Sequence, residues 1–260
     1  MKSNKLTLGV FASADAGKTT LSENILFNSG VIRRIGHVDE GDSFLDSDSM
    51  EKERGISIFS KEARFSVDDM DVVLIDTPGH IDFAAEAERT LNILDAAILI
   101  ISSDGINKRT GQIWSKLDRY RIPRLILVNK CDLASFDRER IEAQLQRISS
   151  ATFDVTNLQK IDDDLCEKIA FSSDLALDIF EQNSGFSKSD IKMLINRATL
   201  FPCVYGSALK GDGVKELIKS LSYFDKQREY DDAFSCFVYK ITRDKSGSRL
   251  SHVKITGGSI

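Results

Sequence analysis

The chain has 260 residues, and its 35 lysine and arginine residues against 40 aspartate and glutamate residues give a formal net charge of −5. This balance excludes a general nucleic-acid coat protein, which needs a strong basic excess, but allows an RNA-containing partner that is contacted over a small area. The hydrophobic fraction of 42% excludes an intrinsically disordered chain.

No membrane-spanning segment or secretory signal is visible in the sequence. The longest apolar run, Ala96–Ile101, is far shorter than the ~20 residues that cross a bilayer. Residues 1–11 lack an apolar signal core and a small-residue cleavage site. We therefore expect a cytoplasmic protein without membrane contact, and a monomer. The four cysteines are far apart and form no CxxC pair, so we expect free, reduced thiols.

Short apolar runs alternate with amphipathic stretches from the N-terminus onward. Four continuous runs rich in β-branched residues predict buried parallel strands, at residues 6–11, 72–75, 96–102 and 125–128. Apolar residues at three- and four-residue spacing predict helices over residues 20–28, 83–94 and 107–120. This alternation predicts an α/β fold, with a mostly parallel sheet and helices on both of its faces.

The remaining stretches complete this first domain. Residues 59–67 alternate between apolar and polar side chains, which favours a half-exposed antiparallel edge strand. Residues 134–200 are charged and helical in pattern, and Asp162, Asp163 and Asp164 suggest a helix start. A further strand over residues 201–205 and a helix over residues 214–221 follow.

A charged stretch at residues 225–232 marks a predicted linker. Beyond it, residues 234–241 and 250–256 have β patterns with a polar turn between them. We expect a first domain over residues 1–225, and residues 233–260 as the opening strands of a truncated β-rich second domain, because two strands alone leave unpaired edges.

A phosphate-binding loop is predicted at residues 12–19, directly after the first strand. Ala12 stands where the usual pattern has glycine, Gly17 allows close backbone approach, and successive amides can form an anion nest. Lys18 can reach the β- and γ-phosphates, and the Thr19 hydroxyl can bind Mg²⁺. The alternative is a turn with a solvated lysine. The nucleotide-binding candidates here are Asp15, Ala16, Gly17, Lys18, Thr19 and Thr20.

Asp76–Thr77–Pro78–Gly79–His80 follows the strand at residues 72–75. An aspartate at the carboxyl end of a parallel strand lies at the ligand-binding edge of an open sheet, where it can hold Mg²⁺ through water. The amide of Gly79 can donate to a γ-phosphate. The alternative is an ordinary turn, since aspartate, threonine, proline and glycine all suit turns.

A guanine-recognition element is predicted at Asn129–Lys130–Cys131–Asp132, after the strand at residues 125–128. The carboxylate of Asp132 can accept both guanine donors, N1–H and N2–H₂, which adenine lacks as a pair. Asn129 can tie the loop to the base edge, and the stem of Lys130 can cover one base face. A second element, Ser207–Ala208–Leu209, follows the strand at residues 201–205, and its amides can meet guanine O6. Either segment alone could be a polar loop.

Arg54–Gly55–Ile56–Ser57 offers a hydroxyl that can complete the Mg²⁺ shell when γ-phosphate is present. The polar residues 33–53 before it suit a segment that a ligand orders. These motifs occur in one order, most of them at strand ends, and jointly they favour a guanine-nucleotide site over an ATPase site.

These motifs resemble those of the translational GTPases, and within that group the elongation factor G branch. The tetracycline-resistance ribosomal protection proteins are the most similar subgroup. The resemblance rests on residues 11–21, 53–57, 76–83, 129–132 and 207–209, with support from residues 36–39, 94–105, 201–207 and 237–241. It covers nearly the whole chain, but only the front part of such a protein.

The resemblance implies hydrolysis of GTP to GDP and phosphate with Mg²⁺, stimulated by the ribosome. The contacts with ribosomal RNA and protein are expected mainly through further domains that these 260 residues do not include. It implies catalytic roles for Lys18 and Gly79, with His80 orienting the attacking water. Mg²⁺ would be held by Thr19, Ser57 and Asp76. Similar phosphate loops also suggest a monovalent cation at Asp15.

The resemblance further implies a helical insert at about residues 134–200 and a β-barrel-like second domain. Three departures are visible: Ser13 in place of the usual histidine, Ser57 in place of threonine, and an unusually acidic segment at residues 39–48. Three readings stay open beside a ribosomal protection protein: an elongation factor G-like translocase, a release-factor-type GTPase, and a GTP switch that hydrolyses little.

Overall fold

The structure is a computed structural model. It describes residues 4–36, 61–76, 89–155, 161–224, 232–244 and 246–258. No helix among these residues is long and apolar enough to cross a membrane.

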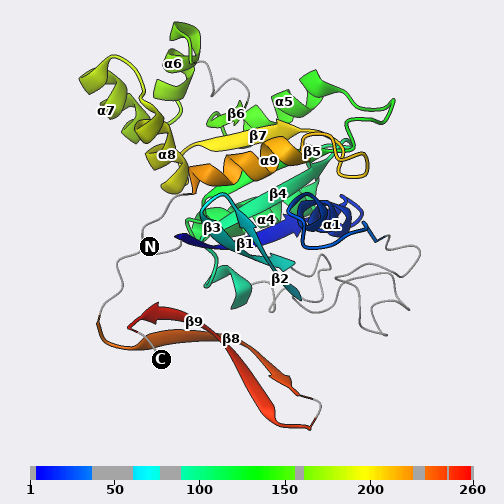
Figure 1. The fold of residues 1–260 in the computed structure, drawn as a ribbon. Coiled ribbons are helices and arrows are strands. Elements are labelled where there is room, and N and C mark those ends of the chain that lie inside the picture. The colour runs from blue at the N-terminus through cyan, green and yellow to red at the C-terminus, as the bar shows by residue number, and fades with distance from the viewer. Residues whose placement is uncertain are drawn as a thin grey trace.

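A seven-stranded sheet forms the centre of the first domain (Figure 1). Its strands are β1 (Asn4–Ala12), β2 (Lys61–Val67), β3 (Met70–Asp76), β4 (Ala96–Ser102), β5 (Arg124–Asn129), β6 (Thr152–Asp154) and β7 (Phe201–Tyr205). The order across the sheet is β2-β3-β1-β4-β5-β7-β6, and every neighbouring pair is parallel except β2 with β3. The predicted α/β class and the antiparallel edge strand are therefore confirmed.

Helices cover both faces of this sheet (Figure 1). They are α1 (Lys18–Asn28), α4 (Lys108–Arg119), α5 (Arg138–Ile148), α6 (Asp163–Ala170), α7 (Asp174–Asn183), α8 (Lys188–Asn196), α9 (Val214–Ser220) and the 3₁₀ turn η3 (Leu221–Tyr223). Five of these helices begin at a side-chain cap that accepts a backbone N–H of the first turn: Asn107, Asp137, Asp162, Ser173 and Ser187. The expected helix start at the Asp162 triplet is confirmed.

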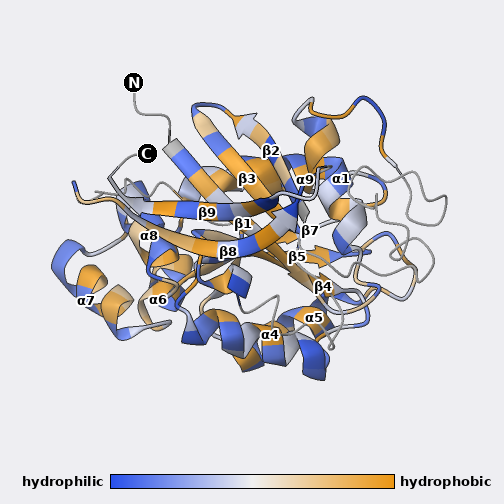
Figure 2. Ribbon diagram, turned by 90° about the horizontal axis from the view of Figure 1, so that it is seen from below, coloured by the Kyte–Doolittle hydropathy of each residue, from blue (hydrophilic) through white to orange (hydrophobic). Residues whose placement is uncertain are grey.

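Two apolar cores lie on opposite sides of the sheet, because successive strand residues point to opposite faces. On one side, Leu8, Val10 and Ile98 pack with α1 and α9, and on the other Leu99 and Ile101 pack with α4 and α5. Both β4 and β5 are buried along their whole length, and both are coloured mainly as hydrophobic in Figure 2. Because both strands are packed on both faces along their whole length, the loops at their carboxyl ends start from fixed positions.

Two predictions within this domain need correction. The stretch at residues 134–200, expected to be helical, also contains the strand β6, because Thr152–Asp154 is too short to show a β pattern. The helix predicted over residues 83–94 ends too late: backbone turns replace it at Asn92 and Ile93, and Asp95 already donates its amide to the carbonyl of Thr7. Residues 83–88 lie outside the described part.

Strands β8 (Ser235–Arg243) and β9 (Arg249–Gly257) form a separate antiparallel hairpin, as predicted (Figure 1). The hairpin contacts the first domain through Lys254, which donates to both carboxylate oxygens of Asp95 at 3.0 and 2.9 Å and to the Thr7 hydroxyl at 3.0 Å. The hydroxyl of Tyr239 donates to Glu62 at 2.9 Å. Most of the predicted linker, residues 225–231, lies outside the described residues.

Candidate nucleotide-binding site

The predicted nucleotide-binding motifs meet at one edge of the sheet. Strands β3, β1, β4, β5 and β7 are consecutive and parallel, so their carboxyl ends share an edge. The phosphate loop follows β1, Asp76 ends β3, Asn129 ends β5, and Ser207 comes two residues after β7. An edge of this kind is where open α/β sheets bind ligands.

The phosphate loop has the backbone shape that an anion needs. Asp15 and Gly17 both have positive φ, 58° and 94°, and the amide of Ala16 donates to the Ser13 carbonyl at 3.3 Å. Gly17 is the N-cap of α1 and offers no side-chain cap. The first-turn amides of α1 can therefore bind a phosphate together with the helix dipole.

Gly17 also has no room for a side chain. A Cβ atom placed there would lie 2.3 Å from Nδ2 of Asn129, the first residue of the guanine motif. The phosphate loop and the guanine loop thus touch at a position that only glycine fits.

Lys18 and Asp76 are in direct contact. Lys18 Nζ lies 2.6 Å from Asp76 Oδ2, and the two side chains are 9% and 1% exposed. Ser22, which the sequence analysis did not single out, approaches Asp76 Oδ1 with its hydroxyl at 3.5 Å. A predicted phosphate ligand and a predicted metal ligand therefore lie side by side. Among the described residues, no group of three histidine, cysteine, aspartate or glutamate residues could hold a metal ion.

Asn129 joins three loops by its side-chain amide. Nδ2 donates to the carbonyl of Ala16 at 2.8 Å, and Oδ1 accepts the amide of Ala208 at 2.7 Å. A backbone bond from Cys131 to the carbonyl of Gly206, 3.0 Å long, adds a second link between the two guanine loops. Asn129 is buried, at 3% exposure, so these bonds are shielded from water.

Asp132 faces the second guanine loop. A hydrogen bond from the Ser207 hydroxyl lowers the pKa of the Asp132 carboxyl, and Lys210, at 3.5 Å, acts in the same direction. The carboxyl is therefore held in its ionised form, which is the form that can accept both guanine donors. Lys130 adopts a left-handed backbone conformation, with φ of 64°.

One predicted set of donors needs refinement. The amides of Ser207 and Ala208 already donate within the protein, to Asp212 and to Asn129. Of these three backbone amides, that of Leu209 has no acceptor among the described residues.

The other predicted site residues divide into two groups. Thr19 and Thr20 lie in the first turn of α1, both half-buried. Ser57, Gly79 and His80 lie outside the described residues, so the structure does not test their predicted positions.

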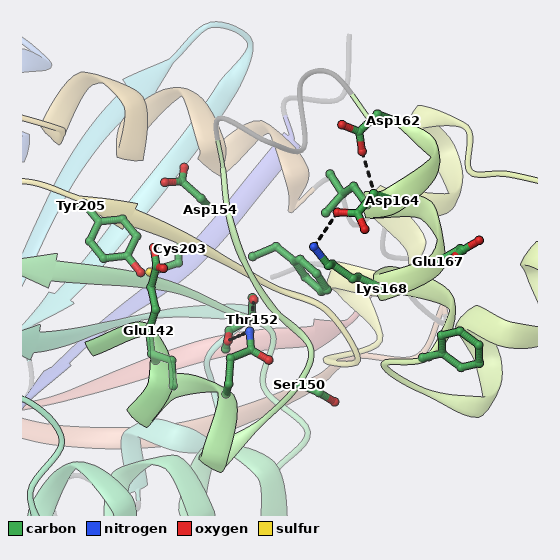
Figure 3. A pocket seen from close by; sticks show the side chains of 15 residues that line it. Glu142, Ser150, Thr152, Asp154, Asp162, Asp164, Glu167, Lys168, Cys203 and Tyr205 are labelled. Atoms are coloured by element: carbon green, nitrogen blue, oxygen red, sulfur yellow. Dashed lines mark hydrogen bonds and ion pairs between the residues drawn. The ribbon is translucent and has the colours of Figure 1, made fainter. Parts of the chain in front are cut away.

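A cavity of about 840 Å³ lies away from these residues, between α5, β6, β7 and α6 (Figure 3). Its walls carry the carboxylates of Glu142, Asp154, Asp162, Asp164 and Glu167. None of the predicted nucleotide-binding residues lines it. Its acidic character is opposite to what a phosphate ligand needs.

Several known proteins are similar to this chain. Residues 3–225 match the model of the elongation factor Tu GTP binding domain. Tetracycline resistance protein TetO of Campylobacter jejuni is 32% identical over 272 residues, covering 98% of this chain and 43% of that protein. Mitochondrial ribosome-releasing factor 2 of Drosophila erecta is 30% identical over 314 residues, covering 97% of this chain and 44% of that protein.

A solved structure from Thermus thermophilus has a similar fold, with a TM-score of 0.83 and 19% identity, over 97% of this chain and 45% of that one. The chain therefore spans less than half the length of these relatives.

Proposed function

Since the chain belongs to the elongation factor Tu GTP binding domain family of translational GTPases, we propose that it binds GTP and GDP at the strand edge and hydrolyses GTP. The family match over residues 3–225 confirms the expected resemblance to translational GTPases. The observation that carries the site assignment is the contact of Asn129 with both the phosphate loop and the second guanine loop.

Binding would begin with an exchange of partners at Lys18. Its ammonium, now paired with Asp76, would turn to the β- and γ-phosphates, while the amides at the start of α1 take the remaining phosphate oxygens. Asp76 and the Thr19 hydroxyl would then face Mg²⁺, and Asp15 is the candidate for a monovalent cation. When bound, Mg²⁺ neutralises charge on the β- and γ-phosphate oxygens.

Hydrolysis would use residues outside the described part, and their roles rest on the resemblance. His80 would orient the attacking water, the Gly79 amide would donate to the γ-phosphate, and Ser57 would bind Mg²⁺. Positioning of this kind contributes about 10²–10⁴-fold to a rate. P-loop GTPases can gain about 10⁵-fold more from an outside partner, and the relatives' names point to the ribosome as that partner.

For the complete protein we propose a cytoplasmic, monomeric translation factor that acts on the ribosome. Similarity to tetracycline resistance proteins favours ribosomal protection, and similarity to a ribosome-releasing factor keeps the release-type function as the second candidate. The domain division at residue 225, with a helical insert at about 134–200, is part of this proposal.

The binding experiment is the Asp132→Asn variant. Xanthine carries a carbonyl where guanine has its amino group, so an asparagine amide could donate to it. We expect weaker GDP binding and a shift of preference toward xanthosine diphosphate in a competition assay. An unchanged preference for GDP would remove base recognition from Asp132.

The hydrolysis experiment compares Lys18→Ala with His80→Ala. Lys18 would meet phosphate charge in the ground state, so its removal should lower nucleotide affinity in calorimetry. His80 would act on water, so its removal should keep affinity and slow phosphate release. Absence of multiple-turnover phosphate release from the full-length protein with ribosomes would instead favour a switch that hydrolyses little.

A further inference from the structure

A buried asparagine of α1 contacts the second guanine loop. Asn24 is 3% exposed, and its Nδ2 donates to the carbonyl of Ala208 at 2.7 Å and to that of Thr20, one turn earlier, at 3.4 Å. No sequence motif of the site includes this residue. An asparagine is a poor choice for a helix interior, and a buried amide costs free energy unless it is hydrogen-bonded. Its presence therefore needs an explanation.

The bond closes a ring that joins the phosphate loop, α1 and the two guanine loops. Asn129 donates to Ala16 in the phosphate loop and accepts from the amide of Ala208. The carbonyl of Ala208 accepts from Asn24, and α1 leads back to Gly17 and the phosphate loop. All four residues in the ring are buried, with Ala16 at 1%, Asn24 and Asn129 at 3% and Ala208 at 0% exposure.

The loop after Ala208 also packs on Asn24. A Cβ placed on Gly211 would lie 3.5 Å from Asn24 Oδ1, and Gly211 has a φ of 79° that favours glycine. Both ends of the Asn24 amide thus face the second guanine loop. Leu209 directly follows Ala208, and its amide is the donor of this loop that remains for guanine O6.

We propose that Asn24 is a positioning residue for guanine recognition, which holds the Leu209 amide at a fixed distance from the phosphate-binding end of α1. The inference rests on the proposed function, since it assumes a guanine nucleotide at the strand edge. In this arrangement the same hydrogen-bonded ring positions the groups that bind the phosphates and the groups that bind the base edge. Asn24 itself does not touch the nucleotide.

The test uses three variants of the whole chain. Asn24→Asp keeps the shape but replaces the amide donor by a carboxylate that faces the Ala208 carbonyl. Asn24→Ser removes the amide without adding charge and serves if the aspartate variant does not fold. Asn28→Ala is the matched control, because the Asn28 amide also donates along α1, to the carbonyl of Asn24 at 2.9 Å, but does not reach the guanine loops.

Two ligands separate positioning from plain destabilisation. GDP and 6-thioguanosine diphosphate differ in the acceptor at position 6, where sulfur accepts a hydrogen bond only weakly. We expect the unchanged protein to prefer GDP. The Asn24 variants should bind GDP about tenfold more weakly, as expected for one lost hydrogen bond, and their preference for GDP over the thio analogue should fall toward one. Asn28→Ala should change neither quantity.

Each result of these binding measurements supports or overturns the positioning role of Asn24. Equal weakening for both ligands would show a merely structural role for Asn24, and unchanged GDP affinity would remove any role; either overturns the proposal. A lack of preference in the unchanged protein would also overturn it, because no O6 contact would then exist. Failure of the unchanged protein to bind GDP at all would instead refute the proposed function, on which the inference rests.

Discussion

A hydroxyl from another loop lowers the pKa of the Asp132 carboxyl. The hydrogen bond from Ser207 is the largest cause that lowers the Asp132 pKa, and Lys210 adds to it. A lowered pKa keeps the carboxylate charged as the pH falls, and guanine binding through it is lost only when the pH passes below that pKa. We predict that Ser207→Ala raises the Asp132 pKa, so that GDP affinity is lost at a higher pH than in the unchanged protein.

The pKa is best followed by carbon NMR titration of the Asp132 carboxyl group, with GDP affinity measured at the same pH values. Lys210→Gln is the comparison variant and should also raise the pKa of Asp132, because Lys210 lowers this pKa through its charge and through a hydrogen bond. A larger shift from Lys210→Gln would assign the lowered pKa to charge rather than to the hydroxyl.

Gly17 and Gly30 offer a matched pair of positive-φ glycines. Both are strained for any side chain, with φ of 94° and 73°, but only Gly17 lies against Asn129, while a Cβ on Gly30 meets nothing within 4 Å. We predict that Gly30→Ala costs about 1–2 kcal/mol of stability without changing GDP affinity. Gly17→Ala should lose GDP affinity, because its methyl group would displace Asn129. Calorimetry measures the GDP affinity of both variants, and thermal unfolding measures their stability. Equal GDP affinity of the two variants would show that the contact between Gly17 and Asn129 does not matter for binding.

At the scale of elements, Arg124 joins α4 to the sheet. Its guanidinium is 0% exposed and lies 4.3 Å from the ring centres of both Trp114 and Phe201. Burial lowers the Arg124 pKa, and its ion pair with Asp118 on α4 opposes this. Removing the partner of a buried charge is more costly than removing both charge and partner.

We predict that Asp118→Ala lowers the free energy of unfolding by about 2–3 kcal/mol, at the low end for a buried ion pair because Asp118 is half-exposed. Arg124→Met should cost less than about 1.5 kcal/mol, because methionine fills much of the same space and leaves no buried charge. Urea unfolding measures both. A greater cost for Arg124→Met would show that the cation–ring contacts outweigh the desolvation of the charge.

The sequence predicts those elements whose signal is local. The strands β4 and β7 occupy the residues expected from their apolar runs, and the strand-end placement of Asp76 and Asn129 follows from the same pattern. The bonds of Asn24 and Ser22 could not be predicted, because their partners are 184 and 54 residues away and no motif pairs them. The short strand β6 forms only by pairing with β7, which a three-residue pattern cannot show.

At the scale of the molecule, one lysine carries much of the contact between the hairpin and the first domain. Lys254 is 13% exposed and Asp95 5%, and Asp95 also accepts the amide of Thr7 at 2.8 Å. Asp95 directly precedes β4, so this contact lies at the amino ends of the parallel strands, opposite to the proposed nucleotide site. A second contact, from Tyr239 to Glu62, reaches the edge strand β2.

We predict that Lys254→Met loosens the hairpin without changing GDP affinity. Methionine can fill the space of the lysine stem but removes the ammonium that faces the buried Asp95 carboxylate, and breaking a buried ion pair costs about 3–5 kcal/mol in comparable cases. Amide hydrogen exchange in β8 and β9 should therefore become at least about tenfold faster, since local opening follows the free energy of the contacts that are lost. Arg243→Met is the control, because the Arg243 guanidinium donates to the carbonyl of Gly247 within the hairpin turn. Equal protection of the hairpin in Lys254→Met and in the unchanged protein would assign its attachment to Tyr239 and Glu62 instead, and a fall in GDP affinity would mean that the two edges of the sheet are coupled.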